Sequence, residues 1–227
     1  MARGKQSKGT CLYCGQEIAK SGVAKHLSAC PKRQAVLEQA GRKKGKSETL
    51  YHLRIQDAEL NDFWLVLEMR GSATLKDLDF YLREIWLECC GHMSQFSVGG
   101  WGGNEIPMKR RIDEVFKPGV ELTHIYDFGT ESQTLVKDVG VREGQPTTSR
   151  PIALMARNLM PAAECIECKK PAAWLCNECL IEEEVWGALC DAHAKTHPHD
   201  DYGEPIPLVN SPRLGMCGYE GPAEPPY

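Results

Sequence analysis

Apolar and polar residues alternate with the period of β-strands through much of the chain between residues 51 and 158. YHLRIQ (51–56) and FWLVLEMR (63–70) are rich in β-branched and aromatic residues, which is typical of strands. Three further segments, separated by glycine and proline turns, alternate as strands do: MSQFSVGG (93–100), ELTHIYDFG (121–129) and SQTLVKDVGV (132–141). PIALMARN (151–158) is the expected last strand. These segments predict a central mixed or antiparallel sheet.

The period changes in SATLKDLDFYLREIWLECCG (72–91), which predicts a helix. Thr74 can cap it together with Asp77 three residues later, and Gly91 ends the pattern. The apolar stripe of this helix comprises Leu75, Leu78, Leu82 and Ile85. A sheet with one main helix is an α+β fold, and about a hundred residues are enough for such a domain to fold alone.

The eleven cysteines raise the question of disulfides or metal. No window is apolar enough for a membrane span, and MARGKQSKGTCLYC lacks the apolar core of a secretory signal. We therefore expect a cytoplasmic protein without membrane contact, in a compartment that keeps thiols reduced. Eight of the cysteines lie in CxxC pairs or beside histidines, which favours zinc.

The stretch CIECKKPAAWLCNECLIEEEVWGALCDAHAKTHPHD (165–200) supplies eight ligand-type residues in four pairs. A CxxC turn places both thiolates on one side, as a tetrahedral zinc requires. Because only seven residues separate the first two pairs, we expect an interleaved arrangement. One zinc would be bound by Cys165, Cys168, Cys190 and His193, and the other by Cys176, Cys179, His197 and His199. Cys217 or Asp200 could take the place of His199.

This spacing resembles the B-box zinc finger, a small cross-braced domain used for protein contacts and self-association. Residues from 161 onward contain few aliphatic side chains, and residues 204–227 are rich in proline and glycine. About forty residues of this composition rarely bury enough apolar surface to fold without metal or disulfides. The composition and the ligand pattern therefore agree.

CLYCGQEIAKSGVAKHLSAC (11–30) contains a second pattern, a CxxC pair followed after eleven residues by HxxxC. The last two ligands lie four residues apart, on one face of a helix that begins near Ser21. The pattern resembles a ββα zinc finger of the CCHC type, with ligands Cys11, Cys14, His26 and Cys30. Three zinc ions are thus expected, all in closed four-ligand sites. Since a catalytic zinc keeps a position open for water, this argues against a zinc hydrolase.

Charge is distributed unevenly along the chain. Residues 1–50 carry eleven Lys and Arg against three Glu, a net charge of +8, whereas the remainder has a net charge of −12. A basic arm on an acidic body indicates contact with polyanions, although a solvated arm explains the same pattern. Phosphate contacts would use Lys25, Lys32, Arg33, Arg42, Lys43, Lys44 and Lys46.

The middle region resembles the plasmid pRiA4b ORF-3-like family, which is associated with plasmids and insertion elements. The resemblance covers about residues 50–158 and is carried by FWLVLEMRGSATLKDLDFYLREIW, HMSQF and above all HIYDFG (124–129). It implies an α+β domain and directs attention to His92, Tyr126 and Asp127. Cys89 and Cys90, adjacent at a helix end, are interpreted as buried hydrophobic residues, with redox chemistry as the alternative.

Five segments follow from these patterns: a CCHC-type finger at 1–40, a basic linker at 41–50, the α+β domain at 51–160, a B-box-like module at 161–203 and a tail at 204–227. The leading hypothesis is a zinc-binding adaptor with a protein partner, which also contacts nucleic acid through its basic arm. One alternative is an enzyme of unknown reaction that uses a polar cleft around His92, Asp127 and Glu131. A third hypothesis is a DNA-binding regulator of a mobile element.

Overall fold

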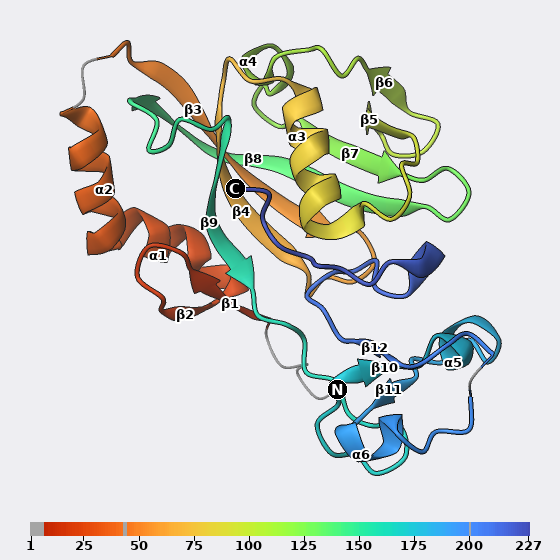
Figure 1. Cartoon of the computed structure of the whole chain (residues 1–227). Helices are drawn as coiled ribbons and strands as arrows, with labels where there is room; N and C mark the ends of the chain where they lie inside the picture. The colour runs from red at the N-terminus through yellow and green to blue at the C-terminus, as the bar shows by residue number, and fades with distance from the viewer. Residues whose placement is uncertain (1–6, 43–44, 200) are drawn as a thin grey trace.

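The computed structural model describes residues 7–42, 45–199 and 201–227, and its main element is a large antiparallel sheet (Figure 1). In these residues the sheet has the strand order β2-β1-β9-β4-β3-β8-β7-β5-β6. The α+β class predicted from the sequence is confirmed. The strands of the sheet are β1 (Lys8–Cys11), β2 (Glu17–Ala19), β3 (Glu48–Asp57), β4 (Trp64–Arg70), β5 (Ser94–Val98), β6 (Asn104–Ile106), β7 (Glu121–Tyr126), β8 (Ser132–Gly144) and β9 (Ile152–Asn158).

The predicted helix forms as α3 (Leu75–Leu82) and continues into one π-helical turn, η2 (Arg83–Leu87). Thr74 and Asp77 make the expected capping box: the Asp77 backbone N–H donates to the Thr74 side chain, and the Thr74 N–H donates to Asp77 Oδ2 at 2.7 Å. All four residues of the apolar stripe are fully buried. The helix therefore packs its apolar face on the sheet, together with the short α4 (Ile112–Val115).

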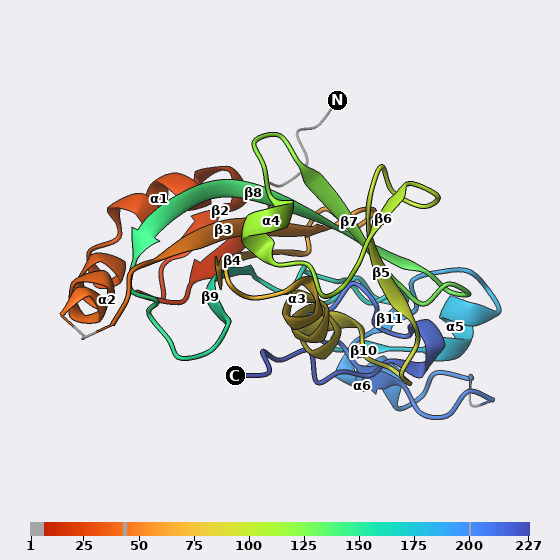
Figure 2. The same ribbon diagram turned by 90° about the horizontal axis from the view of Figure 1, so that it is seen from above.

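The central strands are buried on both faces. Along β4, Leu65, Leu67 and Met69 face the core beneath α3, whereas Trp64 and Val66 belong to a second core on the opposite face. This second core is covered by the N-terminal segment, whose helices are η1 (Lys20–Gly22), α1 (Val23–Ala29) and α2 (Pro31–Gly41). Figure 2 shows α3 and α1 on opposite sides of the sheet.

The finger predicted at residues 1–40 is joined to the sheet rather than set apart from it. Strand β1 pairs with β9 through Gly9–Asn158, Thr10–Arg157 and Cys11–Ala156. A Cβ atom on Gly9 would lie 2.5 Å from the Trp64 ring and 2.3 Å from the Arg157 carbonyl oxygen, so only glycine allows this approach. The N-terminal hairpin is thus an outer part of the main sheet.

A buried ion cluster fixes α2 to the same face. Glu68, only 3% exposed, accepts two hydrogen bonds from Arg142, at 2.6 and 2.8 Å, and lies 3.1 Å from His52 and 3.5 Å from Arg33 of α2. Burial alone would raise the pKa of Glu68, but the hydrogen bonds from His52 and Arg142 outweigh it and lower the pKa to about 2. The carboxylate is therefore ionised and holds three basic side chains together.

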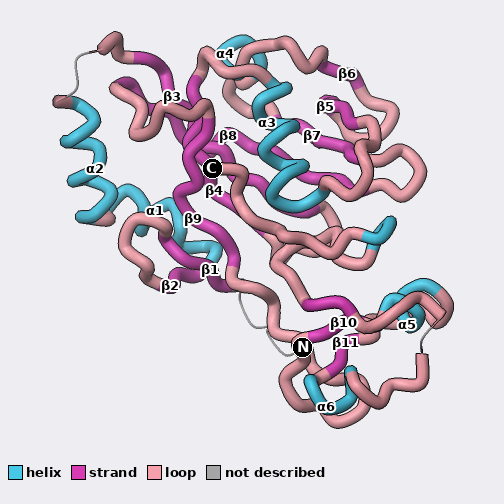
Figure 3. The backbone as a smooth tube through the Cα atoms, in the orientation of Figure 1, coloured by secondary structure: helices cyan, strands magenta, loops and turns pink. Residues whose placement is uncertain are grey.

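The C-terminal module has a small sheet of its own, in the order β11-β10-β12. Figure 3 shows that most of the rest of this module is loop. Its strand β12 belongs to the segment predicted as a tail, so the module extends beyond residue 203. The elements are β10 (Trp174–Leu175), α5 (Asn177–Ile181), β11 (Ala188–Leu189), α6 (Asp191–Ala194) and β12 (Ile206–Pro207).

After β12 the chain returns to the main domain and follows its surface to the C-terminus (Figure 1). Ser211 Oγ donates to the Trp86 carbonyl at 2.6 Å, and Tyr227 packs edge-on against Tyr81 with ring centroids 5.6 Å apart. Arg213 is fully buried and donates to Asp127 Oδ2 at 2.6 Å and to the Thr130 carbonyl at 2.9 Å. The tail is thus a packed part of the domain.

Within the described ranges, every helix is too short or too polar to cross a membrane.

Candidate metal centres

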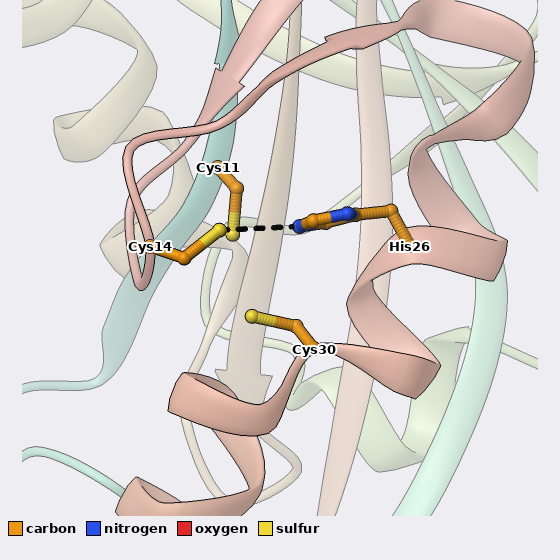
Figure 4. A group of neighbouring side chains, drawn as sticks. All are labelled: Cys11, Cys14, His26 and Cys30. Carbon is orange, nitrogen blue, oxygen red and sulfur yellow. Dashed lines mark hydrogen bonds between the residues drawn. The ribbon is translucent and has the colours of Figure 1, made fainter.

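The N-terminal cluster comprises the four predicted residues Cys11, Cys14, His26 and Cys30, whose ligand atoms all lie within 4.8 Å of one another. Cys11 is the last residue of β1 and Cys14 lies in the turn that follows, whereas α1 presents His26 and Cys30 caps its C-terminal end. Figure 4 shows the four side chains converging, with Cys14 Sγ 3.4 Å from His26 Nε2. Cys11 and Cys30 are buried in the core shared with Trp64.

The first C-terminal cluster also joins the pairs that the sequence predicts: Cys165, Cys168, Cys190 and His193. His193 Nδ1 lies 3.2 Å from Cys165 Sγ and 3.7 Å from Cys190 Sγ. Cys168 Sγ lies 3.8 Å from Cys190 Sγ. The residues come from the turn before β10 and from the start of α6.

The second C-terminal cluster contains Cys176, Cys179, His197 and His199. Cys179 Sγ lies 3.2 Å from His197 Nε2 and 3.3 Å from His199 Nδ1. Cys176 caps α5 by accepting the Cys179 N–H at 3.4 Å. Of the three candidates for the last ligand, His199 is the one in this cluster; Cys217 lies in another cluster, and Asp200 lies outside the described residues.

Glu167 connects the two C-terminal clusters. Its Oε1 accepts from His197 Nδ1 at 3.0 Å, and its Oε2 lies 3.7 Å from His193 Nε2. In each histidine the opposite ring nitrogen faces the cysteines. A carboxylate in this position orients the imidazole and strengthens it as a ligand, as outer carboxylates do in zinc proteins. Because one side chain serves both clusters, their geometries are linked.

The distances and the donor atoms fit a metal ion. Two thiolates on a tetrahedral zinc, each about 2.3 Å from the ion, lie about 3.8 Å apart. The 3.8 Å between Cys168 and Cys190 has this value, whereas a disulfide needs about 2.05 Å. Sulfur and imidazole nitrogen are the donors that zinc prefers in closed structural sites. The Cys/His clusters could therefore hold metal ions, and their chemistry is consistent with zinc.

Two thiols of the C-terminal clusters, those of Cys179 and Cys165, have strongly altered pKa values. Burial, reinforced by the neighbouring Cys176, raises the pKa of Cys179 to about 12. For Cys165, burial acts in the same direction but is outweighed by the Cys190 backbone N–H and the His193 ring, so that its pKa falls to about 6. A divalent cation would hold both groups as thiolates, since only the deprotonated sulfur binds metal.

The structure also forms a fourth cluster that the sequence did not predict: Cys89, Cys90, His92 and Cys217. The interpretation of Cys89 and Cys90 as buried hydrophobic residues is wrong, since Cys90 is exposed and Cys89 only half-buried. The sequence does contain a signal, because Cys89, Cys90 and His92 lie within four residues. The fourth member comes from the tail and has no spacing relation to the others.

Of the three polar residues of the enzyme hypothesis, His92 and Asp127 lie in contact, with His92 Nε2 3.3 Å from Asp127 Oδ2. Asp127 is 4% exposed, and its carboxylate accepts the N–H groups of Gly129 and Thr130 in addition to the Arg213 guanidinium. His92 turns toward the fourth cluster, and Glu131 is exposed and accepts from the neighbouring Gln133. Asp127 thus stabilises the turn after β7 and anchors the tail.

The basic residues proposed for phosphate contact fall into three groups. Lys25, Lys32, Arg42 and Lys46 are exposed, and Lys43 and Lys44 lie outside the described residues. The predicted phosphate contact of Arg33 is corrected by the structure. This residue is 6% exposed, and its guanidinium donates to Glu68 and to the Leu27 carbonyl. An arginine so buried and paired is not available to a phosphate.

Comparisons with known proteins give little further information. No family model matches the chain, and no curated protein matches it. Among solved structures, a protein of unknown function from Methanosarcina mazei Go1 is similar at 17% identity, with a TM-score of 0.40 over 48% of this chain and 67% of that chain. Function must therefore be inferred from the residues of this chain.

Proposed function

We propose that the protein is a zinc-stabilised adaptor, in which the three sequence-predicted clusters hold zinc and the C-terminal module binds another protein. The observation that carries this proposal is the exposed apolar segment of that module. Ile181, Val185 and Trp186 are 49%, 44% and 46% exposed, although the module has few apolar residues with which to build a core. Exposed apolar side chains of this kind are typical of protein contact sites.

The second C-terminal cluster fixes the shape of this segment. The Val185 N–H donates to the Cys179 carbonyl at 3.1 Å, and the Cys176 N–H donates to the Gly187 carbonyl at 2.9 Å. A Cβ atom on Gly187 would lie 2.5 Å from Cys179 Cβ, so the loop passes directly over the cluster. A metal ion there would hold Val185 and Trp186 in one conformation, which reduces the entropy lost on binding.

The charge of the segment defines the chemistry of the partner. Three consecutive glutamates, Glu182, Glu183 and Glu184, lie between the exposed apolar residues, and all three are exposed. A surface that combines these carboxylates with apolar side chains is complementary to a protein segment with basic residues and apolar anchors. The B-box resemblance, which implies protein contacts, points in the same direction.

Replacing Val185 and Trp186 with serine should weaken partner binding by tenfold or more, on the order of a hot-spot loss. Proteins captured by the full chain would be identified by mass spectrometry and their affinities measured with purified components. Leu60→Ser, at a residue 49% exposed on the main domain, is the matched control. If the double variant retained the same partners at the same affinity while its metal content was unchanged, this surface would be the wrong one.

A second candidate function, nucleic-acid binding, is favoured by the exposed basic side chains Lys25, Lys32, Arg42 and Lys46. A regulator of a plasmid or mobile element, as the ORF-3-like resemblance implies, would use them on phosphates. Removing one phosphate-binding side chain should reduce the slope of log affinity against log salt by about 0.9 for duplex DNA. The full chain is needed for this test, because β1 is a strand of the main sheet.

Changing these four residues to glutamine should therefore weaken duplex binding and flatten its salt dependence, as measured by fluorescence anisotropy over a salt series. Glutamine at Lys76, Lys109, Lys117 and Lys137, four exposed lysines outside the basic arm, is the control with the same charge change. Equal reductions in affinity in both variants, or no binding by the unaltered chain at low salt, would exclude nucleic acid as a partner.

A further inference from the structure

The cysteine count points to a site beyond those already proposed. The eleven cysteines of the chain all lie in one of four clusters: three clusters contain three cysteines and one histidine, and one contains two of each. The three sequence-predicted sites use eight of them. The remaining three are Cys89, Cys90 and Cys217, and the structure brings these three together with His92.

The geometry of this fourth cluster repeats that of the others. Cys90 Sγ lies 3.8 Å from both Cys89 Sγ and Cys217 Sγ, the separation expected of thiolates on one tetrahedral zinc. His92 Nε2 lies 3.0 Å from Cys90 Sγ and 3.3 Å from Cys217 Sγ. The four ligand atoms thus surround one point, and all lie within 4.8 Å of one another.

The surroundings of the cluster suit a site of three thiolates. Three thiolates and one Zn²⁺ carry a net charge of −1, and the fully buried Arg213 lies beside them, with Nη2 3.5 Å from Cys89 Sγ. The Tyr126 hydroxyl lies 3.6 Å from the same sulfur. Asp127 Oδ2 accepts from Arg213 at 2.6 Å, so it holds this cation beside the thiolates. Contacts of this kind orient and stabilise the ligands of metal sites.

We propose that Cys89, Cys90, His92 and Cys217 bind a fourth metal ion, a thiophilic divalent cation such as Zn²⁺, which fastens the C-terminal tail to the α+β domain. Three ligands follow η2 and lead into β5, whereas Cys217 lies in η3 (Met216–Gly218) of the tail. The ion would therefore join segments 127 residues apart in sequence. It would act together with Arg213, which fixes the same tail to the turn that contains Asp127.

This site differs from the other three in its accessibility. Cys90 and Cys217 are exposed and His92 is half-buried, whereas each of the other clusters has at least two buried cysteines. An exposed site exchanges its ion more readily, so a chelator should remove this ion before the others. The competing arrangement is a Cys90–Cys217 disulfide, which would require the sulfurs to approach from 3.8 Å to about 2.05 Å.

The test measures the zinc content per chain of three full-length proteins purified under reducing conditions. These are the unaltered chain, the Cys217→Ser variant and the control variant Glu220→Ser. Because residue 217 is exposed, the serine variant should fold, and the thermal transition of the main domain checks this. The expected result is one zinc ion fewer per chain in Cys217→Ser alone, accompanied by faster proteolysis of residues 211–227. With Co²⁺ in place of zinc, the thiolate charge-transfer absorption should fall by about a quarter, since one of four such sites is removed.

Equal zinc content in the two serine variants would overturn the proposal, whatever the total per chain. So would a Cys90–Cys217 disulfide that persists in the reduced preparation, identified by peptide mapping. Because the readout is a difference of one ion between variants, it is independent of whether the C-terminal module binds a protein partner.

Discussion

Replacing Cys165 with serine is expected to unfold the C-terminal module and to release both of its ions, while the nine-stranded sheet remains folded. The larger of the two apolar clusters of this module consists mainly of metal ligands, since four of its five buried residues are Cys165, Cys176, Cys179 and Cys190, and the other cluster has only three buried residues, Leu175, Ile206 and Leu214. Such a core cannot replace the metal. Structural zinc contributes about 10–16 kcal/mol in small zinc-finger peptides, which is comparable to the stability of a whole domain.

The effect should extend to the second ion because the two clusters share Glu167, which contacts one histidine of each. Hydrogen exchange measures the outcome: amides of residues 161–203 should lose protection, while those of β3, β4 and β8 keep theirs. Lys170→Ser, an exposed change in the same turn, should leave both ions and the protection in place. A Cys165→Ser chain with a protected C-terminal module would show that metal is not what holds this module together.

Loss of the N-terminal ion should affect the other part of the chain: the main sheet, and not the C-terminal module, should be destabilised. In His26→Ala the β1–β2 hairpin and α1 lose a ligand of their shared site, and the core of Trp64, Val66 and Met155 loses its cover. Truncating a buried side chain the size of Trp64 costs about 3–5 kcal/mol, and uncovering it should cost a similar amount. For a chain of this length, about 3 kcal/mol corresponds to roughly 6–12 °C in Tm.

Differential scanning calorimetry with bound zinc would measure this shift, with Lys25→Ala as a control in the same helix at an exposed position. The transition to follow is that of the main sheet, which is identified by its persistence in Cys165→Ser chains. An unchanged transition in His26→Ala would mean that the finger is an independent module, contrary to the pairing of β1 with β9.

The strands and the main helix were predictable because their patterns are local. The strand-like composition of residues 51–56 and 63–70 and the alternation in residues 132–141 match β3, β4 and β8. The stripe from Leu75 to Ile85 matches the buried face of α3 and η2. The three sequence-predicted clusters could also be predicted from the spacing of their ligands, since these lie within short stretches that fold as knuckles. The structure brings each of these sets together.

What the sequence did not reveal depends on contacts between distant segments. Strand β1 is four residues long and pairs with β9 almost 150 residues later, so no local sequence pattern predicts this pairing. Arg33 occurs in a basic run typical of a solvated arm, yet it is buried because Glu68 of β4 lies opposite. Arg213 and Cys217 occur in a tail rich in proline and glycine, and only the fold places them beside Asp127 and Cys90.

The central claim is that thiolates and imidazoles hold this molecule together through metal ions, and native mass spectrometry of the full chain under non-reducing conditions tests it most directly. The mass should exceed that of the polypeptide by at least three zinc ions, and by four if the site at Cys217 is filled, with no hydrogens lost to disulfides. A folded chain with the mass of the metal-free polypeptide, or one that has lost pairs of hydrogens to S–S bonds, would contradict this claim.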